Sequence, residues 1–291
     1  MRSLPGGPSS GGSWSNMGRR GSGRWGELGP RVVSAVVLMV LALGVTWLGG
    51  RAFDLFWLVA GWAIVWEWQT LIGGGRRPTR MLIGGLTLAV AALLTFDRLP
   101  LAAVAALMAG AAMLAAAADP GKRALSGFGI VYAGALVVAV AVLRQSFPYA
   151  TEAIVWLYAV VWGTDCMAYF AGRLIGGPKL YPRFSPSKTW SGFLCGIACG
   201  SLIGLLVSPD IAPAAPMLLL GLLAGAVAQG GDLLESALKR RVGAKDSGHL
   251  IPGHGGVMDR LDGFLASSVF AACLGTWRFG VDASALGLFH W

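Results

Sequence analysis

Long apolar runs alternate with short polar segments along most of this chain of 291 residues. Since a helix of about 20 apolar residues spans the hydrocarbon core of a bilayer, each run predicts one membrane helix. The candidate helices lie at residues 32–49, 53–72, 81–97, 100–118, 126–143, 151–172, 191–208, 213–234 and 261–279. We therefore predict an all-α fold, in which about nine transmembrane helices form a polytopic membrane bundle.

The run at 53–72 differs from the others because an acid, Glu67, interrupts it. Its four tryptophans are also typical of a helix that lies in the membrane interface. From the pattern alone, a full span and an interfacial helix both stay open. For Glu67 we favour a structural role, as an acid that snorkels or pairs with another helix, over a functional one.

Composition supports a membrane protein independently of the helix pattern. The chain is 55% hydrophobic and 13% charged, with a mean hydropathy of +0.66, whereas about a quarter of the residues in a soluble domain are charged. All four cysteines fall within apolar runs, and none has the paired spacing of a zinc site. For Cys195 and Cys199, which would share a helix face, packing between helices explains the spacing better than a metal or redox pair. We expect neither a disulfide nor zinc.

The first thirty residues are rich in Gly, Ser and Arg and contain few apolar side chains. We predict that 1–30 is a disordered, basic cytoplasmic tail, since it lacks apolar surface to bury. The run at 32–49 begins late and has no convincing cleavage site, so we expect a retained membrane helix rather than a signal peptide. The remainder divides into N-terminal membrane helices at 31–150 and a C-terminal catalytic region at 151–291.

The positive charges indicate an orientation in the membrane. If the helices alternate in direction and the N-terminus is cytoplasmic, nineteen of the 23 Lys and Arg residues lie on the cytoplasmic side. Arg51, Arg98, Arg144 and Arg278 then lie outside, so the positive-inside rule favours this arrangement. We expect a multi-pass protein of the cell membrane, in contact with membrane lipids. The net charge of +9 is spread over short loops, which argues against a nucleic-acid partner.

Two polar blocks lie on the predicted cytoplasmic side, where nucleoside triphosphates are found. The first, 165–192, begins with Asp165, about two turns inside the end of its helix. An acid at this depth normally faces a polar cavity or a partner. The alternative for Asp165 is a buried ion pair with Lys188 or Arg260.

The second block, 231–263, combines acids, bases and glycines beside a membrane helix. It contains five of the fourteen acids of the chain, which are Asp232, Glu235, Asp246, Asp259 and Asp262. Magnesium prefers carboxylate oxygens and commonly shares its coordination sphere with substrate phosphates. Asp232 and Asp259 are the first choices as ligands, because they close and open predicted helices at one edge. Asp262 lies one turn after Asp259 and adds a third ligand, for one ion or two.

Groups that suit a polyphosphate surround these acids. The glycines at 253, 255 and 256 permit close approach of backbone N–H groups to phosphate. The bases that can neutralise phosphate charge are Lys188, Lys239, Arg240, Lys245 and Arg260. Glu235 is placed to form an ion pair with Lys239 on one helix face.

The second block resembles the signature of the phosphatidate cytidylyltransferase family in both order and spacing. The matching positions are Ser236, Lys239, Arg240, Lys245, Asp246, Ser247, Gly248, Pro252, Gly253, His254, Gly255, Gly256, Asp259, Arg260, Leu261 and Asp262. The first block matches a further family motif at Asp165, Ala168, Tyr169, Gly172, Ser185, Pro186, Ser187, Lys188 and Thr189. The chain departs from that motif at Ser191, where the family typically has Glu, which puts an acid-dependent role there in doubt.

The resemblance implies a polytopic membrane enzyme that uses Mg²⁺ to make CDP-diacylglycerol and pyrophosphate from CTP and phosphatidic acid. The candidate catalytic residues are Asp165, Lys188, Lys239, Arg240, Lys245, Asp246, His254 and Arg260. The candidate substrate-binding residues are Ser185, Ser187, Thr189, Ser236, Ser247, Gly253, Gly255 and Gly256. For His254 we favour a loop-shaping role over a general base, because phosphatidate already carries an ionised oxygen. A monovalent cation as an additional cofactor and a homodimer are compatible with the sequence.

Two other classes of function compete with this interpretation. One is a different CTP-dependent membrane lipid enzyme, such as a polyprenol or phytol kinase or an ether-lipid cytidylyltransferase. The motif from Pro252 to Asp262 favours the phosphatidate enzyme over these. The other is a transporter, suggested by the intramembrane Asp165. Transporters usually place ionisable residues near the bilayer midplane and often contain repeats, whereas these charges gather at one edge.

Overall fold

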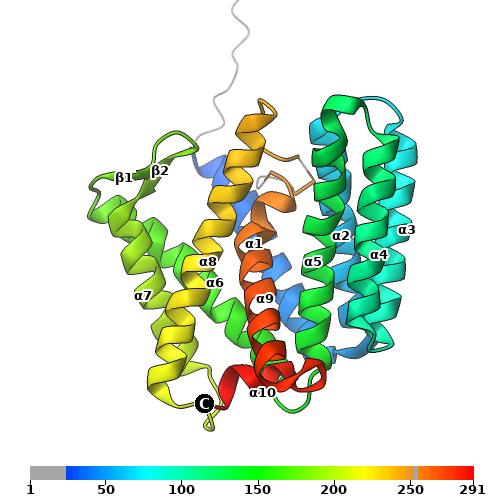
Figure 1. The fold of residues 1–291 in the computed structure, drawn as a ribbon. Helices are drawn as coiled ribbons and strands as arrows, with labels where there is room; N and C mark the ends of the chain where they lie inside the picture. The colour runs from blue at the N-terminus through cyan, green and yellow to red at the C-terminus, as the bar shows by residue number, and fades with distance from the viewer. Residues whose placement is uncertain (1–23, 249, 252–254) are drawn as a thin grey trace, which may run out of the picture.

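The computed structural model describes residues 24–248, 250–251 and 255–291, and it is predominantly helical (Figure 1). In these ranges the α-helices are α1 (Arg24–Leu48), α2 (Gly50–Ile72), α3 (Arg77–Phe96), α4 (Pro100–Ala117), α5 (Arg123–Gln145), α6 (Ala150–Leu174), α7 (Trp190–Leu206), α8 (Ala214–Arg241), α9 (Met258–Phe279) and α10 (Ser284–Phe289). Each of the nine predicted apolar runs forms a helix, which confirms the all-α class. A short antiparallel hairpin of β1 (Lys179–Tyr181) and β2 (Ser185–Thr189), which the pattern did not predict, joins α6 to α7.

Among the described residues, fewer helices than the predicted nine are long and apolar enough to span a membrane. Within the described ranges, six helices are long and apolar enough to cross a membrane, namely α2 to α6 and α8. A seventh span is counted if α9 and the helical segment after it, bent by 113°, form one unit. The apolar part of α1 and the whole of α7 are shorter. For the part of the chain that the structure describes, the count by this measure is therefore below the predicted nine, and α7, which directly follows the hairpin, has 17 residues.

Several predicted boundaries also shift. Residues 1–23 of the predicted tail lie outside the described residues, and 24–30 form the first turns of α1. Glu67 does not interrupt α2, which continues to Ile72. The helix predicted at 213–234 extends to Arg241, and the one predicted at 261–279 begins at Met258. A helix can extend beyond its apolar run because polar side chains on the added turns find partners inside the protein.

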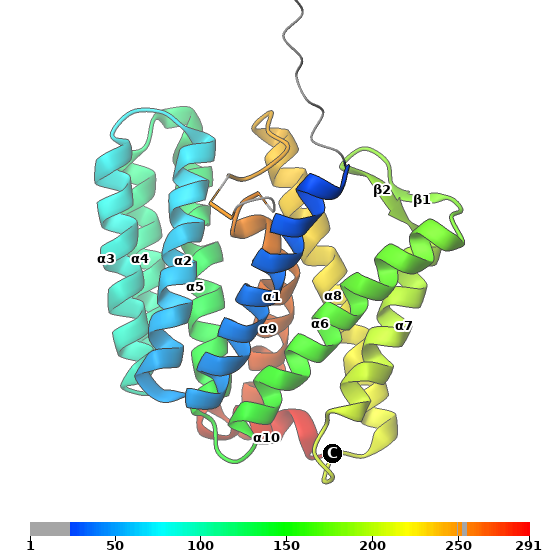
Figure 2. The ribbon, with the colours of Figure 1, turned by 180° about the vertical axis from the view of Figure 1, so that it is seen from behind.

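The helices form two groups joined by α9. Helices α2 to α5 pack together on one side, and α6, α7 and α8 pack together on the other (Figure 1). Helix α9 contacts both α5 and α8. Aromatic rings strengthen this junction, since Phe264 of α9 stacks against Trp57 of α2 and Tyr158 of α6 with centroid distances of 5.1 Å. Helix α1 crosses the back of the molecule (Figure 2).

A row of glycines brings α6 and α7 into close contact. Gly196 and Gly200 lie one turn apart on α7, where an added Cβ would stand 2.8 Å from the carbonyl oxygens of Thr164 and Val160, respectively. Small residues at such spacing allow membrane helices to approach closely. This contact fixes the hairpin between α6 and α7 relative to α6 itself.

Candidate active site

The two polar blocks lie at the same end of the bundle. The β1–β2 hairpin and the loop between α8 and α9 share the end at which the described part of α1 begins, while α10 lies at the other end (Figures 1 and 2). The blocks meet directly, because Nζ of Lys188 on β2 lies 2.5 Å from Oδ2 of Asp232 on α8. Lys188 and Asp232 thus form an ion pair that joins segments far apart in the sequence.

Asp165 extends this cluster toward the membrane interior. It lies on α6, and Gln229 of α8 donates a hydrogen bond of 2.9 Å from Nε2 to its Oδ1. Gln229 is buried and lies one turn before Asp232. Asp262 of α9 lies next to α8, since an added Cβ on Gly231, the residue before Asp232, would stand 2.7 Å from the Asp262 carbonyl oxygen. Three helices therefore contribute acids to one charged cluster.

Asp259 belongs to a neighbouring network. Its Oδ1 accepts a hydrogen bond of 2.7 Å from Nζ of Lys239, which lies 2.7 Å from Oε2 of Glu235 as well. The backbone N–H groups of Ser247 and Gly256 also donate to the Asp259 carboxylate, at 3.1 to 3.2 Å. Asp259 thereby holds α8 and the α8–α9 loop together. Lys239, predicted to neutralise phosphate, is placed between two carboxylates.

Glu67 of α2 reaches the same loop from the other group of helices. Its Oε1 accepts a hydrogen bond from the N–H of Val257, and its Oε2 accepts one from the N–H of Met258, each of 2.8 Å. The hydroxyl of Ser247 donates to Oε2 at 3.1 Å. Sequence reasoning did not include Glu67 in the site. An acid within an apolar run signalled a partner, but that partner lies 180 to 191 residues away along the chain.

The hydroxyl residues of the first block differ in their surroundings. The Thr189 side chain accepts a hydrogen bond of 3.1 Å from the N–H of Gly192 and so caps α7. Ser191, which departs from the family motif, donates to the carbonyl of Gly176 and lies 3.1 Å from the Thr189 hydroxyl. Ser191 thus joins the hairpin to α7. Ser185 is half-buried on β2, and Ser187 is exposed there.

The other predicted site residues lie around the charged cluster. Ser236 is 3.4 Å from Oδ1 of Asp232. Gly255 has φ of +86°, and a Cβ there would stand 3.1 Å from Oδ2 of Asp259. The bases and acid exposed at this end are Arg240, Lys245, Asp246 and Arg260. Gly253 and His254 lie outside the described residues.

The oxygen donors of the cluster suit a hard divalent cation. Asp232 already holds the ammonium group of Lys188, and the backbone of Asp262 lies beside Gly231 of α8. Among the described residues, no group of three or more His, Cys, Asp and Glu side chains is arranged around one metal position. Magnesium commonly takes one or two protein carboxylates and completes its coordination with phosphate and water. The donor set therefore fits Mg²⁺ that arrives with a nucleotide.

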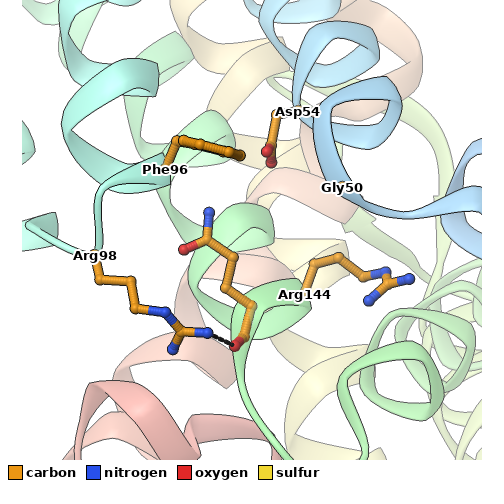
Figure 3. A pocket seen from close by; sticks show the side chains of 6 residues that line it. Gly50, Asp54, Phe96, Arg98 and Arg144 are labelled. Carbon is orange, nitrogen blue, oxygen red and sulfur yellow. Dashed lines mark hydrogen bonds between the residues drawn. The ribbon is translucent and has the colours of Figure 1, made fainter.

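A separate pocket of about 250 Å³ lies at the opposite end of the bundle (Figure 3). Its lining residues are Gly50, Asp54, Phe96, Arg98, Arg144 and Gln145. Arg98 donates to the carbonyl of Gln145 at 3.1 Å and pairs with Asp282. None of the predicted site residues lines this pocket, and Arg98 and Arg144 belong to the four positive charges predicted to lie outside.

The fold and the charged cluster define a polytopic membrane protein with a charged polar site at one end of its helices. The chain belongs to the cytidylyltransferase family, whose family model matches residues 29–277. This membership confirms the resemblance drawn from the two motifs. The two motifs identify the family from sequence alone because many polar residues match in both order and spacing.

Two of the similar proteins match most of the chain, and a third matches less than half of it. The phosphatidate cytidylyltransferase of Brucella abortus biovar 1 (strain 9-941) is 43% identical over 252 residues, which cover 86% of this chain and 93% of the relative. That of Pseudomonas aeruginosa is 35% identical over 270 residues, covering 87% and 98%. That of Bacillus subtilis (strain 168) is 42% identical over 126 residues, covering 42% and 47%.

Proposed function

We propose that the chain transfers a cytidylyl group from CTP to phosphatidic acid, releasing pyrophosphate and forming CDP-diacylglycerol. Similarity to proteins named phosphatidate cytidylyltransferase over nearly their full length carries the proposal. The contact between the two motif blocks at Lys188 and Asp232 supports it. The reaction belongs to phospholipid biosynthesis and makes the protein a nucleotidyltransferase.

The chemistry is an in-line displacement at phosphorus. An ionised phosphate oxygen of phosphatidate forms a bond to the α-phosphorus of CTP, and the bond from that phosphorus to the bridging oxygen of pyrophosphate breaks. The leaving pyrophosphate takes the electron pair. No external base is required, because the attacking oxygen of phosphatidate is already ionised. The protein chiefly positions the two substrates and neutralises charge.

The residues of the cluster divide this work. Lys188 is placed to hold a phosphate oxygen once a nucleotide competes for its contact with Asp232, and exposed Arg260 and Lys245 border the same end. Asp165, deeper along α6, lines the region where headgroup chemistry meets the acyl chains. Mg²⁺ would be held by Asp232 and Asp259, with Asp262 as a third candidate ligand, and it would supply positive charge to the phosphates.

We also propose that this end of the bundle faces the cytoplasm, which supplies CTP. The positive-charge asymmetry supports this orientation. The shared location of both blocks at the end opposite α10 supports a single reaction face (Figure 1).

Product analysis with purified protein tests the proposed activity. The protein is incubated with Mg²⁺, phosphatidate and CTP labelled separately at the α- and γ-phosphates. We expect α-label in a lipid and γ-label in pyrophosphate in equal amounts. A lipid kinase would instead transfer the γ-label to a polyprenol or phytol and release CDP. Absence of a labelled liponucleotide from active, folded protein would refute the proposal.

A further inference from the structure

Glu67 is a buried acid from the N-terminal half of the chain at the edge of a site made by the C-terminal half. Glu67 lies near the end of α2, and only 2% of the residue is exposed. The three hydrogen bonds described for it come from Ser247, Val257 and Met258, in the loop before α9 and its first residue. Burial of a carboxylate is costly unless donors surround it, so this contact holds a specific arrangement.

The beginning of α9 explains why an acid is needed there. The first N–H groups of a helix have no partner within the helix and carry a partial positive charge. Val257 precedes α9 and offers no side-chain cap. Glu67 takes that role from another helix, since its two oxygens accept the N–H groups of Val257 and Met258. A capping function that is usually local is thus supplied by α2.

Two glycines allow the loop to close around this carboxylate. A Cβ on Gly248 would stand 2.8 Å from Oε1 of Glu67, and one on Gly256 would stand 2.7 Å from Oε2. Neither distance is compatible with a larger residue unless the loop moves. Gly256 therefore serves packing against Glu67, in addition to its predicted place near phosphate.

Ser247 connects Glu67 to the acid of the site. Its hydroxyl donates to Glu67, while its N–H donates to Asp259. Asp259 also follows Met258 directly in the chain, so its backbone is fixed by the same cap. We infer that Glu67 is a positioning residue for the reaction, which sets the start of α9 and the loop that holds Asp259. The effect of Glu67 on the reaction rests on the proposed function, whereas its contact with the start of α9 does not.

The test compares Glu67→Gln with wild-type protein by hydrogen exchange and by kinetics. Glutamine keeps the size of the side chain but replaces one acceptor oxygen with an NH₂ donor. At least one hydrogen bond to Glu67 is then lost, because its partner is itself a donor. We expect amide exchange in peptides covering 245–260 to rise about tenfold or more, while exchange elsewhere is unchanged. We expect kcat to fall about tenfold with little change in KM for phosphatidate, because the aligned site and not lipid binding is affected.

Glu152→Gln is the matched control, since Glu152 is an exposed acid in the first turn of α6. It should leave exchange and kcat unchanged. Glu67→Asp keeps the charge but is one methylene shorter, and it should give intermediate values. If Glu67→Gln does not fold, the same measurements are made on Glu67→Asp.

Unchanged exchange at 245–260 in a folded Glu67 variant would overturn the inference. Faster exchange with wild-type kcat would also overturn it, since Glu67 would then be a cap without influence on the reaction. Failure of the wild-type protein to make liponucleotide would instead refute the proposed function, and the exchange experiment would still report on the cap.

Discussion

Replacing Lys239 with methionine should destabilise the end of the molecule that carries the site. Nζ of Lys239 lies 2.7 Å from both Glu235 and Asp259, and the three side chains are 11%, 1% and 10% exposed, respectively. Methionine fills similar space without a charge, so both carboxylates lose their cation. Breaking a buried ion pair in this way costs about 3–5 kcal/mol, because the remaining charge stays buried without compensation.

The contacts predict where that cost falls. Asp259 keeps the N–H groups of Ser247 and Gly256 as donors, whereas Glu235 is almost completely buried beside the lost cation. Adding Glu235→Gln to Lys239→Met should therefore recover about 2 kcal/mol, a coupling in the range expected for residues in contact. Glu235→Gln alone should lower stability less than Lys239→Met does.

Thermal unfolding of purified protein, followed by tryptophan fluorescence and gel filtration, measures these differences. The cost for Lys239→Met corresponds to a fall of roughly 10 °C in Tm for a chain of this size. Lys245→Met, at an exposed position of the loop, is the control and should change Tm little. A Lys239→Met protein with wild-type Tm, or a double variant no more stable than the single one, would refute the reasoning.

Three further predictions concern metal, packing and sidedness. Asp232→Asn and Asp259→Asn should each abolish turnover of labelled CTP while the protein still inserts, and near-normal rates in both at ordinary Mg²⁺ would contradict the metal assignment. Gly200→Ala should lower stability by about 1–3 kcal/mol, because the added Cβ would press on a backbone carbonyl of α6. Gly44→Ala is the control and should not lower stability, since the space around Gly44 is open. Equal Tm values for the two variants would exclude the clash. Asp246→Cys, in a background without the native cysteines, should react with an impermeant thiol reagent in inverted vesicles and not in intact cells, so labelling of intact cells would reverse the orientation.

The sequence determined the class of the molecule and identified several residues of the charged cluster. Apolar runs of membrane length must form helices, because lipid offers no partner for backbone N–H and C=O groups. Each of the nine runs accordingly forms one. The sequence identifies Asp165, Lys188 and Asp232 because charged residues at the end of a membrane helix are costly unless they have a partner or a function. Their order also matches a known family.

Only the tertiary structure decided which of these residues meet. The ion pair of Lys188 with Asp232 joins β2 to α8, and the Glu67 contacts span up to 191 residues. Local periodicity carries no information on such pairings, since they depend on how whole helices pack. Packing also extended α8 to Arg241, because Lys239 finds two carboxylates there, a partner set that no apolar pattern reveals.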